Sequence, residues 1–414
     1  MRVGARTEAP PGTGPQAQAQ AGPRAQAGPE GWTAGLGEAL AGIAERAAEH
    51  DRRASFPHEA FEALHAAGVL TLTLPGRYGG REAGLAQTAV VVGAVAGADP
   101  SVALVTAQHL MTHAALRAPD NAWPAEVRER VQRSAAEGPA LINSLRVEPD
   151  LGTPARGGLP ATVAARQGEH WSLTGHKIYS TGVPGLRWLS VWARTDDPEP
   201  LVGAFLVEAG TPGYRVEETW DQLGMRATRS DDVIFTGARI PAGHAVDLNP
   251  AGAPPAGRGT AFLGWNNVVL GALYHGVARA ARNWLVRYLG ERTPANLGRP
   301  LATLPRFQAA VGEIEAWLLT GDRLLEGAAH AVDAGDEAAA RSGLVKYTVT
   351  GNAIRIVEQG LALTGNPGLS RRNPLERHYR DVLCGRVHTP QDDTILTGAG
   401  ALAFGELGEG EIRR

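Results

Sequence analysis

The 414-residue sequence is poor in several features, and each shortage excludes a class of structure or partner. A single cysteine, Cys384, excludes an intramolecular disulfide and suits a reducing compartment. No apolar run approaches the roughly 20 residues that a membrane-spanning helix needs. The formal net charge of −3 gives no electrostatic basis for binding nucleic acid or an anionic membrane. We therefore expect a cytoplasmic protein with neither nucleic acid nor membrane as a partner.

Lysine is also scarce, because Lys177 and Lys346 are the only lysines and arginine supplies almost all the remaining positive charge. Alanine, glycine and proline are abundant, so we interpret this bias as a mark of GC-rich coding and not of mechanism. Histidine, cysteine and aspartate do not cluster at metal-ligand spacing, and no metal site is predicted. No strand–GxGxxG–helix unit and no GxSxG elbow occurs, so neither a nicotinamide site nor a serine hydrolase is predicted.

Hydrophobic periodicity divides the chain into helices, then strands, then helices. Residues 1–31 are rich in Ala, Gly, Pro and Gln, lack the apolar core of a signal peptide, and are predicted to be a disordered tail. Apolar residues at helical spacing predict a helical domain over 32–140. Alternating, turn-punctuated runs over 141–247 predict a small β domain, a barrel or sandwich. A Pro/Gly-rich stretch at 248–260 is predicted to be a linker or mobile loop, and 261–414 a helical bundle.

A series of short motifs occurs in order along this layout. They are Leu74-Pro75-x-x-Tyr78-Gly79-Gly80, Glu148-Pro149-x-x-Gly152-Thr153, Gly175-x-Lys177-x-Tyr179-Ser180-Thr181-Gly182, Leu223-Gly224-Met225-Arg226-Ala227-Thr228, Arg292 with Gln308, and Gln359 with Gly365-Asn366-Pro367-Gly368 and Arg380-Asp381. Together they resemble the acyl-CoA dehydrogenase superfamily. The resemblance implies an α+β multidomain fold with an N-terminal helical domain, a central small β-barrel and a C-terminal four-helix bundle.

The resemblance also implies a flavin cofactor, FMN or FAD. The residues that it places at the cofactor are Tyr179, Ser180, Thr181, Arg292, Gln308, Gln359, Gly365, Asn366 and Gly368. A flavin ring needs a flat wall, which a tyrosine ring provides, and donors near N5 and O4, which hydroxyls provide. Glycines would let the backbone approach a pyrophosphate closely. Because Arg292 is followed by Thr-Pro-Ala where the family has Phe-Gly, the choice between FMN and FAD stays open.

In the family, the segment that corresponds to 359–368 reaches the cofactor of a neighbouring subunit. The resemblance therefore implies a homo-oligomer, and we expect a tetramer before a dimer. Wide apolar faces on the helices after residue 261 agree with a buried interface.

The family's usual catalytic base is missing from this sequence. Counted without gaps from Arg380-Asp381, the position of the proton-abstracting glutamate holds Thr389, preceded by His388. Some relatives place that glutamate early in the first bundle helix, where this chain has Asn266. Neither a hydroxyl nor an amide removes an α-proton from an acyl thioester. Ordinary acyl-CoA dehydrogenation is therefore disfavoured, unless Asp392 or the adjacent Asp393 takes the role of base.

Histidines stand at positions that resemble another branch of the superfamily, the dibenzothiophene monooxygenases. The shared features are His109 after an apolar helical run, the Tyr179-Ser180-Thr181-Gly182 segment, and His388-Thr389-x-x-Asp392. Those enzymes take reduced flavin from a separate reductase and transfer oxygen from dioxygen to sulfur or nitrogen. We expect His109, His388, Ser180 and Asp392 to be catalytic. Histidine can act as a proton source at neutral pH.

Both histidines could instead have a purely structural role. His109 could be a helix histidine bonded to the backbone, with His113 one turn further on as a competitor. His388 could be a core histidine bonded to Asp392 or to a carbonyl.

Three functions stay open from the sequence. The first is a flavin-dependent oxidoreductase, preferably a two-component monooxygenase acting on a small organic S-, N- or C-centre. The second is an acyl-CoA dehydrogenase with a non-standard base. The third is a non-catalytic homologue that binds an acyl group or a carrier protein.

Overall fold

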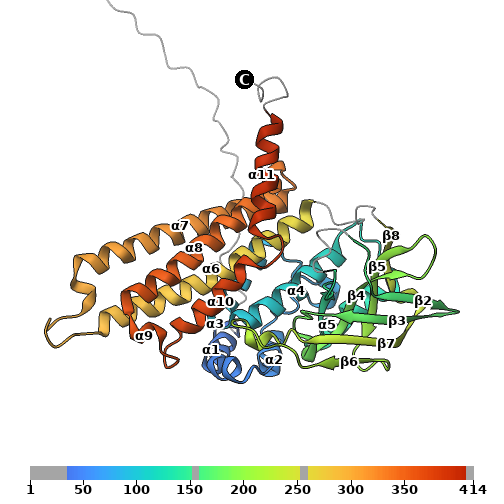
Figure 1. The fold of residues 1–414 in the computed structure, drawn as a ribbon, viewed down its shortest axis with the longest axis horizontal. Coiled ribbons are helices and arrows are strands. Elements are labelled where there is room, and N and C mark those ends of the chain that lie inside the picture. The colour runs from blue at the N-terminus through green and yellow to red at the C-terminus, as the bar shows by residue number, and fades with distance from the viewer. Residues whose placement is uncertain (1–34, 152–157, 252–259, 407–414) are drawn as a thin grey trace, which may run out of the picture.

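The chain folds as helices, then a β domain, then a helical bundle, as the sequence predicts (Figure 1). The computed structural model describes residues 35–151, 158–251 and 260–406. The predicted tail at 1–31 lies outside the described residues, as do residues 252–259 of the predicted linker. No described helix is both long and apolar enough to cross a membrane.

The N-terminal helices pack around long apolar stretches of α3 and α4. The elements are α1 (Leu36–Arg53), α2 (His58–Ala66), the 3-10 turn η2 (Gly76–Tyr78), α3 (Leu85–Ala98), α4 (Pro100–Arg117) and α5 (Ala125–Glu137). Asp99 separates α3 from α4, and its carboxylate accepts the N–H groups of Ser101 and Val102 at 2.7 and 3.3 Å. Pro100 occupies the first turn of α4, where no backbone donor is needed.

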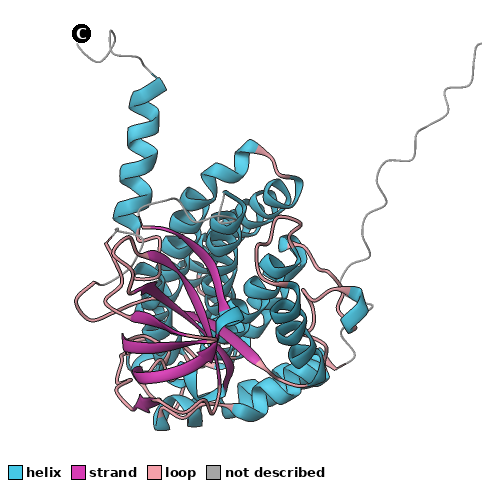
Figure 2. Ribbon diagram, turned by 90° about the vertical axis from the view of Figure 1, so that its right-hand side faces the viewer, coloured by secondary structure: helices cyan, strands magenta, loops and turns pink. Residues whose placement is uncertain are grey.

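The β domain is one sheet of eight strands among the described residues, drawn in magenta in Figure 2. The strand order is β6-β7-β3-β2-β4-β5-β8, and β1 pairs with β4 in parallel. The strands are β1 (Leu141–Leu145), β2 (Val163–Gln167), β3 (His170–Lys177), β4 (Leu186–Thr195), β5 (Leu201–Glu208), β6 (Tyr214–Glu217), β7 (Asp232–Pro241) and β8 (Ala245–Pro250), with 3-10 turns η4 (Val183–Gly185), η5 (Arg226–Thr228) and η6 (Ala242–His244). Strand β8 extends past the predicted boundary at 247/248, and Asn249 and Pro250 pair with β5.

The C-terminal bundle is built on long antiparallel helices. They are α6 (Thr260–Glu291), α7 (Pro305–Ala334) and α8 (Ser342–Thr364), followed by α9 (Asn366–Leu369), α10 (Leu375–Leu383) and α11 (Asp392–Glu406), with 3-10 turns η7 (Leu301–Thr303), η8 (Glu337–Arg341) and η9 (Cys384–Arg386). Helix α6 is central, since α3, α7, α8 and α10 all pack against it. Figure 1 shows α11 projecting away from the body of the molecule.

Buried polar contacts tie the β domain to both helical units. The backbone N–H of Met225 donates to the Asp381 carboxylate of α10 at 2.7 Å. Arg380, next to it, makes a two-pronged ion pair with Asp51 of α1, at 2.8 and 2.7 Å. Gly224 lies against the carbonyl of Arg380, where an added Cβ would come within 2.3 Å of that oxygen. The Leu223–Thr228 motif and the Arg380-Asp381 pair are therefore the two sides of one contact between domains.

Candidate active site

A buried ion pair supports the strand that leads to the candidate flavin segment. Lys177, the last residue of β3, donates from Nζ to Glu148 Oε1 at 2.6 Å, and both side chains are almost fully buried. The Glu148 carboxylate also accepts the backbone N–H groups of Ala161 and Thr162 and the Thr162 hydroxyl. Burial lowers the pKa of Lys177 to about 8, so the ammonium keeps its charge at pH 7. Burial alone would raise the pKa of Glu148, but the bonds from Lys177 and Thr162 outweigh it and lower this pKa.

The segment that follows presents a tyrosine ring and a hydroxyl. Tyr179 has a left-handed backbone (φ 54°), is 55% exposed, and meets the Trp220 ring edge-on at 6.2 Å. The Thr181 hydroxyl accepts a hydrogen bond from Ser230 Oγ at 3.0 Å, which leaves its own proton free. Ser180 is fully buried, and its hydroxyl has no partner among the described residues. The structure thus exposes Tyr179 and encloses Ser180 behind it.

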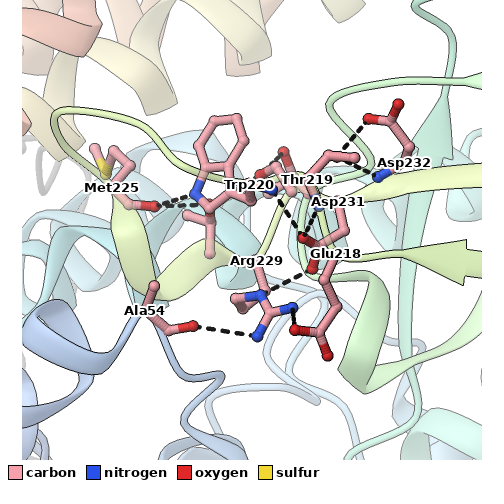
Figure 3. Close-up of polar contacts among 11 residues, drawn as sticks. Ala54, Glu218, Thr219, Trp220, Met225, Arg229, Asp231 and Asp232 are labelled. Atoms are coloured by element: carbon pink, nitrogen blue, oxygen red, sulfur yellow. Dashed lines mark hydrogen bonds and ion pairs between the residues drawn. The ribbon is translucent and has the colours of Figure 1, made fainter.

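The loop that carries Trp220 is cross-braced, as Figure 3 shows. The Asp231 carboxylate accepts the backbone N–H of Trp220 at 3.0 Å and the Nε–H of Arg229 at 2.8 Å. The Trp220 indole donates to the carbonyl of Met225 at 3.1 Å, which fixes the ring orientation. Arg229 also reaches the carbonyl of Ala54 at the end of α1. These bonds hold an aromatic edge beside Tyr179.

His388 sits at the second part of the site, held by two bundle helices. The Tyr274 hydroxyl of α6 lies 2.6 Å from His388 Nδ1. Burial raises the pKa of Tyr274 well above its usual value, so the phenol is neutral and donates this bond. Burial, with the charge of Lys346 nearby, lowers the pKa of His388 to about 4. The imidazole is therefore neutral at pH 7, accepts at Nδ1 and carries its proton on Nε2.

Lys346 of α8 organises the turn that contains His388. Its buried ammonium donates to the carbonyls of His388 and Pro390 at 2.9 and 2.8 Å. Burial lowers the pKa of Lys346 to about 8, and the neighbouring carboxylate of Asp392 opposes that shift. One oxygen of Asp392 is buried without a partner in the described part of the chain.

The two positions where the family resemblance implies a catalytic glutamate meet in this structure. Asn266 of α6 donates from Nδ2 to the carbonyl of Thr389 at 2.8 Å. The two alternative base positions therefore belong to one place in the fold, and neither side chain there is a carboxylate. Asp392, the alternative base, begins α11 only three residues after Thr389.

His109 has the contacts of a buried helix histidine that is bonded to the backbone. It is fully buried in α4, and Nε2 pairs with the carbonyl of Leu70 at 2.9 Å. Burial lowers its pKa to about 4. His113 lies edge-on to it at 4.5 Å between ring centroids, with neither nitrogen bonded among the described residues. A catalytic role for His109 stays a prediction, and in this structure its Nε2 N–H is directed at the carbonyl of Leu70.

The distal cofactor candidates lie away from Tyr179 within one chain. Figure 1 places α9, which begins at Asn366, at the end of the bundle farthest from the β domain. Arg292 and Gln308 are exposed, and Gln359 donates to Glu313 at 3.1 Å. Gly365 has a positive φ of 63°, and a Cβ on Gly368 would come within 2.2 Å of the Thr364 hydroxyl. Local helix packing therefore already explains the glycine at 368.

Two site residues, Tyr274 and Lys346, are not marked as functional by the sequence. The tyrosine belongs to an apolar helical stretch that looks like ordinary core. The lysine carried a usable signal, because both of the chain's lysines are buried at structural junctions. In the sequence alone, their scarcity indicates only a coding bias.

Family models of the acyl-CoA dehydrogenase N-terminal, middle and C-terminal domains match residues 39–119, 147–238 and 268–392. The chain belongs to the acyl-CoA dehydrogenase family. It is 32% identical over 381 residues to YdbM of Bacillus subtilis, which carries the name of an acyl-CoA dehydrogenase, covering 90% of this chain and 96% of that protein. It is 28% identical to cyclohex-1-ene-1-carbonyl-CoA dehydrogenase of Geobacter metallireducens, covering 87% and 94%.

Solved structures with this fold include one crystallised with FMN and one named as a monooxygenase. KijD3, in complex with FMN and an amino-keto-deoxysugar nucleotide, superposes with a TM-score of 0.78 at 27% identity, covering 89% of this chain and 92% of that one. Dibenzothiophene monooxygenase TdsC from Paenibacillus sp. A11-2 has a TM-score of 0.73 at 19% identity, covering 86% and 92%, which shows the fold alone. The predicted fold and the flavoprotein family are confirmed.

Proposed function

We propose that this protein is a two-component flavin monooxygenase. It would use reduced FMN or FAD and dioxygen to oxygenate a sulfur, nitrogen or carbon centre of a small organic substrate. The observation that carries the proposal is the contact between Asn266 and Thr389, since both of the family's base positions converge there without a carboxylate. His388 lies beside them, and its Nε2–H can donate a hydrogen bond because Nδ1 is bonded to Tyr274.

The residues around Tyr179 fit a flavin ring. The exposed Tyr179 ring offers a flat surface for the flavin. Its backbone is strained in the left-handed region, and its ring is packed against Trp220. Thr181 keeps a free hydroxyl proton for an acceptor on the ring. Ser180 could contribute only after its side chain rotates outward. Because the distal residues lie at the far end of the bundle, we assign them to the cofactor of a neighbouring subunit.

The chain's own part in the reaction is to bind, orient and donate. A reduced flavin held here would supply the two electrons with which dioxygen gives one oxygen atom to the substrate and the other to water. Tyr274 fixes the His388 tautomer, so Nε2–H is a donor of constant direction across neutral pH. Lys346 holds the His388 turn in place through two carbonyls and adds positive charge beside it. No residue in this set needs to remove a carbon-bound proton.

An acyl-CoA dehydrogenase with a non-standard base is the second candidate. Asp392 has one carboxylate oxygen without a partner in the described residues, close to the usual base position. The curated relatives described above are also named as dehydrogenases. Under this alternative Asp392 abstracts the α-proton and His388 serves to position the turn.

The assembly that we propose is a homo-oligomer, a tetramer before a dimer, supplied with reduced flavin by a separate reductase. The projecting helix α11 carries exposed Leu402 and Phe404, 72% and 63% accessible. Large apolar side chains on an isolated helix are stabilised by a second copy of the chain.

The experiment that separates the two enzymes compares His388→Ala with Asp392→Asn. The monooxygenase proposal predicts that His388→Ala diverts reduced-flavin oxidation to free hydrogen peroxide, by about 10-fold or more if one aligned donor is lost. The matched control is His330→Ala, an exposed histidine on α7. If an acyl-CoA bleaches the flavin without oxygen, and only Asp392→Asn prevents this, the protein is a dehydrogenase. If the protein binds no form of FMN or FAD below about 0.1 mM, both enzymatic functions are wrong and an acyl- or carrier-protein-binding role stands.

A further inference from the structure

The N-terminal domain contains a small cavity distinct from the Tyr179 and His388 sites. It has a volume of about 250 Å³ and lies between the η2 loop, the end of α4 and helix α5. Its lining residues are Pro75, Arg77, Glu82, Leu116, Arg117, Ala118, Pro119, Arg128 and Gln132. A cavity of this size is below the usual range for a drug-sized ligand, about 300–1,000 Å³, so a whole nucleotide cofactor does not fit inside it.

The cavity is electropositive. Three guanidinium groups line it, from Arg77, Arg117 and Arg128, against the single carboxylate of Glu82. That carboxylate is already used, because it accepts the backbone N–H of Gly76 at 2.8 Å. The C-terminal end of α4 also faces this region, but a helix end carries only about half a negative charge. The lining side chains therefore carry a net positive charge, which Glu129, outside the lining, reduces through its interaction with Arg77.

One of these arginines has its donors free. The Arg117 guanidinium donates to the carbonyls of Thr73 and Ala83, so it contributes charge and has a fixed position. Arg77 lies over the ring of Tyr78 at 4.8 Å, at the exposed rim. Arg128 is half-buried, and no hydrogen bond or ion pair from its side chain occurs within the described residues. A half-buried guanidinium with unused donors is suited to a two-pronged bond with an oxyanion.

Gln132 gives an independent indication of a missing partner. Its side chain is completely buried on α5, yet neither the amide oxygen nor the amide nitrogen has a partner in the described structure. Buried amides are nearly always hydrogen-bonded, so two unpartnered groups on a residue that lines a cavity indicate a ligand that enters it. Gln132 follows Arg128 by one helical turn, which puts the amide and the guanidinium on the same face of α5.

We propose that this cavity is a binding site for a small oxyanion, a carboxylate or a phosphate. Its charged group pairs with Arg128, and a neighbouring oxygen or hydroxyl hydrogen-bonds to Gln132. Arg77 and Arg117 add the surrounding positive charge. This inference concerns a separate part of the chain and does not depend on the proposed function.

The test measures binding of inorganic phosphate and of succinate by calorimetry and by thermal shift, at constant ionic strength set with sodium chloride. The variants are Arg128→Gln and Gln132→Leu, with Arg133→Gln as the matched control, because that exposed arginine lies on the same helix outside this cavity. We expect at least one anion to bind, with its Kd weakened about 10-fold or more in both site variants and unchanged in the control.

Gln132→Leu should also raise the melting temperature without anion, since it removes two unsatisfied buried polar atoms. This second readout shows that the variant is folded. Binding of phosphate alone assigns the site to phosphate groups, and binding of succinate alone to carboxylates. Failure of both anions to bind overturns the proposal, as does an equal loss of affinity in Arg128→Gln and Arg133→Gln.

Discussion

Breaking the ion pair between Lys177 and Glu148 should destabilise the β domain far more than breaking a surface pair. The substitution Lys177→Met removes the ammonium while keeping the length of the side chain. It leaves a carboxylate that is only 2% exposed without the Lys177 ammonium, although three hydrogen bonds from the Ala161 and Thr162 groups remain. A buried charge stripped of its partner costs about 3–5 kcal/mol. We expect a loss towards the lower end, because those hydrogen bonds stay.

The double variant provides the decisive comparison. Glu148→Gln keeps the shape of the side chain and removes its charge, so it should also destabilise, through the unpaired ammonium. Combining it with Lys177→Met removes both charges, and we expect the double variant to recover about 2 kcal/mol relative to the sum of the single losses. The control is Arg215→Met, which breaks a pair to Glu217 whose side chains are 56% and 43% exposed. It should cost less than about 1 kcal/mol.

Urea and thermal unfolding, followed by circular dichroism and tryptophan fluorescence, measure these differences. The same variants should weaken flavin binding, since Lys177 ends the strand two residues before Tyr179. The reasoning is refuted if the single variants lose no more than Arg215→Met, or if their losses simply add. In either case the Glu148 turn and the Lys177 strand do not depend on one another for structure.

Further predictions concern acidity, the His388 donor and assembly. His109 has a folded pKa of about 4 against roughly 6.5 when unfolded, so its contribution to stability is intact above pH 6.5. That contribution is lost as pH falls towards 4, by about 1.4 kcal/mol per pH unit. In His109→Leu, the free energy of unfolding should therefore fall less steeply with decreasing pH. Tyr274→Phe should reduce the fraction of flavin oxidation that leads to oxygenated product by about 3- to 10-fold. That fraction should also depend more steeply on pH, and an unchanged pH dependence would make Tyr274 merely structural. Leu402→Glu with Phe404→Glu should dissociate the assembly in light scattering; an unchanged mass would exclude α11 from the interface.

Local signals predicted the architecture well. The sequence Asp99-Pro100 marks the boundary between α3 and α4, because a side-chain cap and a proline in the first turn both act within a few residues. The change from helical to alternating spacing at Leu141 coincides with the start of β1. Pairing with a distant strand is not visible in the sequence, as for Asn249 and Pro250, which pair with β5 although they begin a Pro/Gly-rich stretch.

The site could be predicted only in part, because its chemistry depends on contacts between distant segments. The motif around Tyr179 and the position of His388 were visible as residue types in order. The sequence could not show that Tyr274 fixes the His388 tautomer, since 114 residues separate them. Nor could it distinguish a reactive His109 from a buried one, because an apolar helical run precedes the histidine in either case. The burial of His109 and its bond to the carbonyl of Leu70 appear only in the folded chain.

The central claim is tested most directly by mixing the protein and anaerobically reduced FMN or FAD with oxygenated buffer in a stopped-flow instrument. The account predicts that bound flavin returns to its oxidised absorbance more slowly than free flavin, with less hydrogen peroxide released, and that His388→Ala restores the behaviour of free flavin. It also predicts that acyl-CoAs do not bleach the oxidised flavin under nitrogen. Rapid anaerobic bleaching by an acyl-CoA, with oxygen reactivity no different from free flavin, would contradict it and make this member of the family a dehydrogenase.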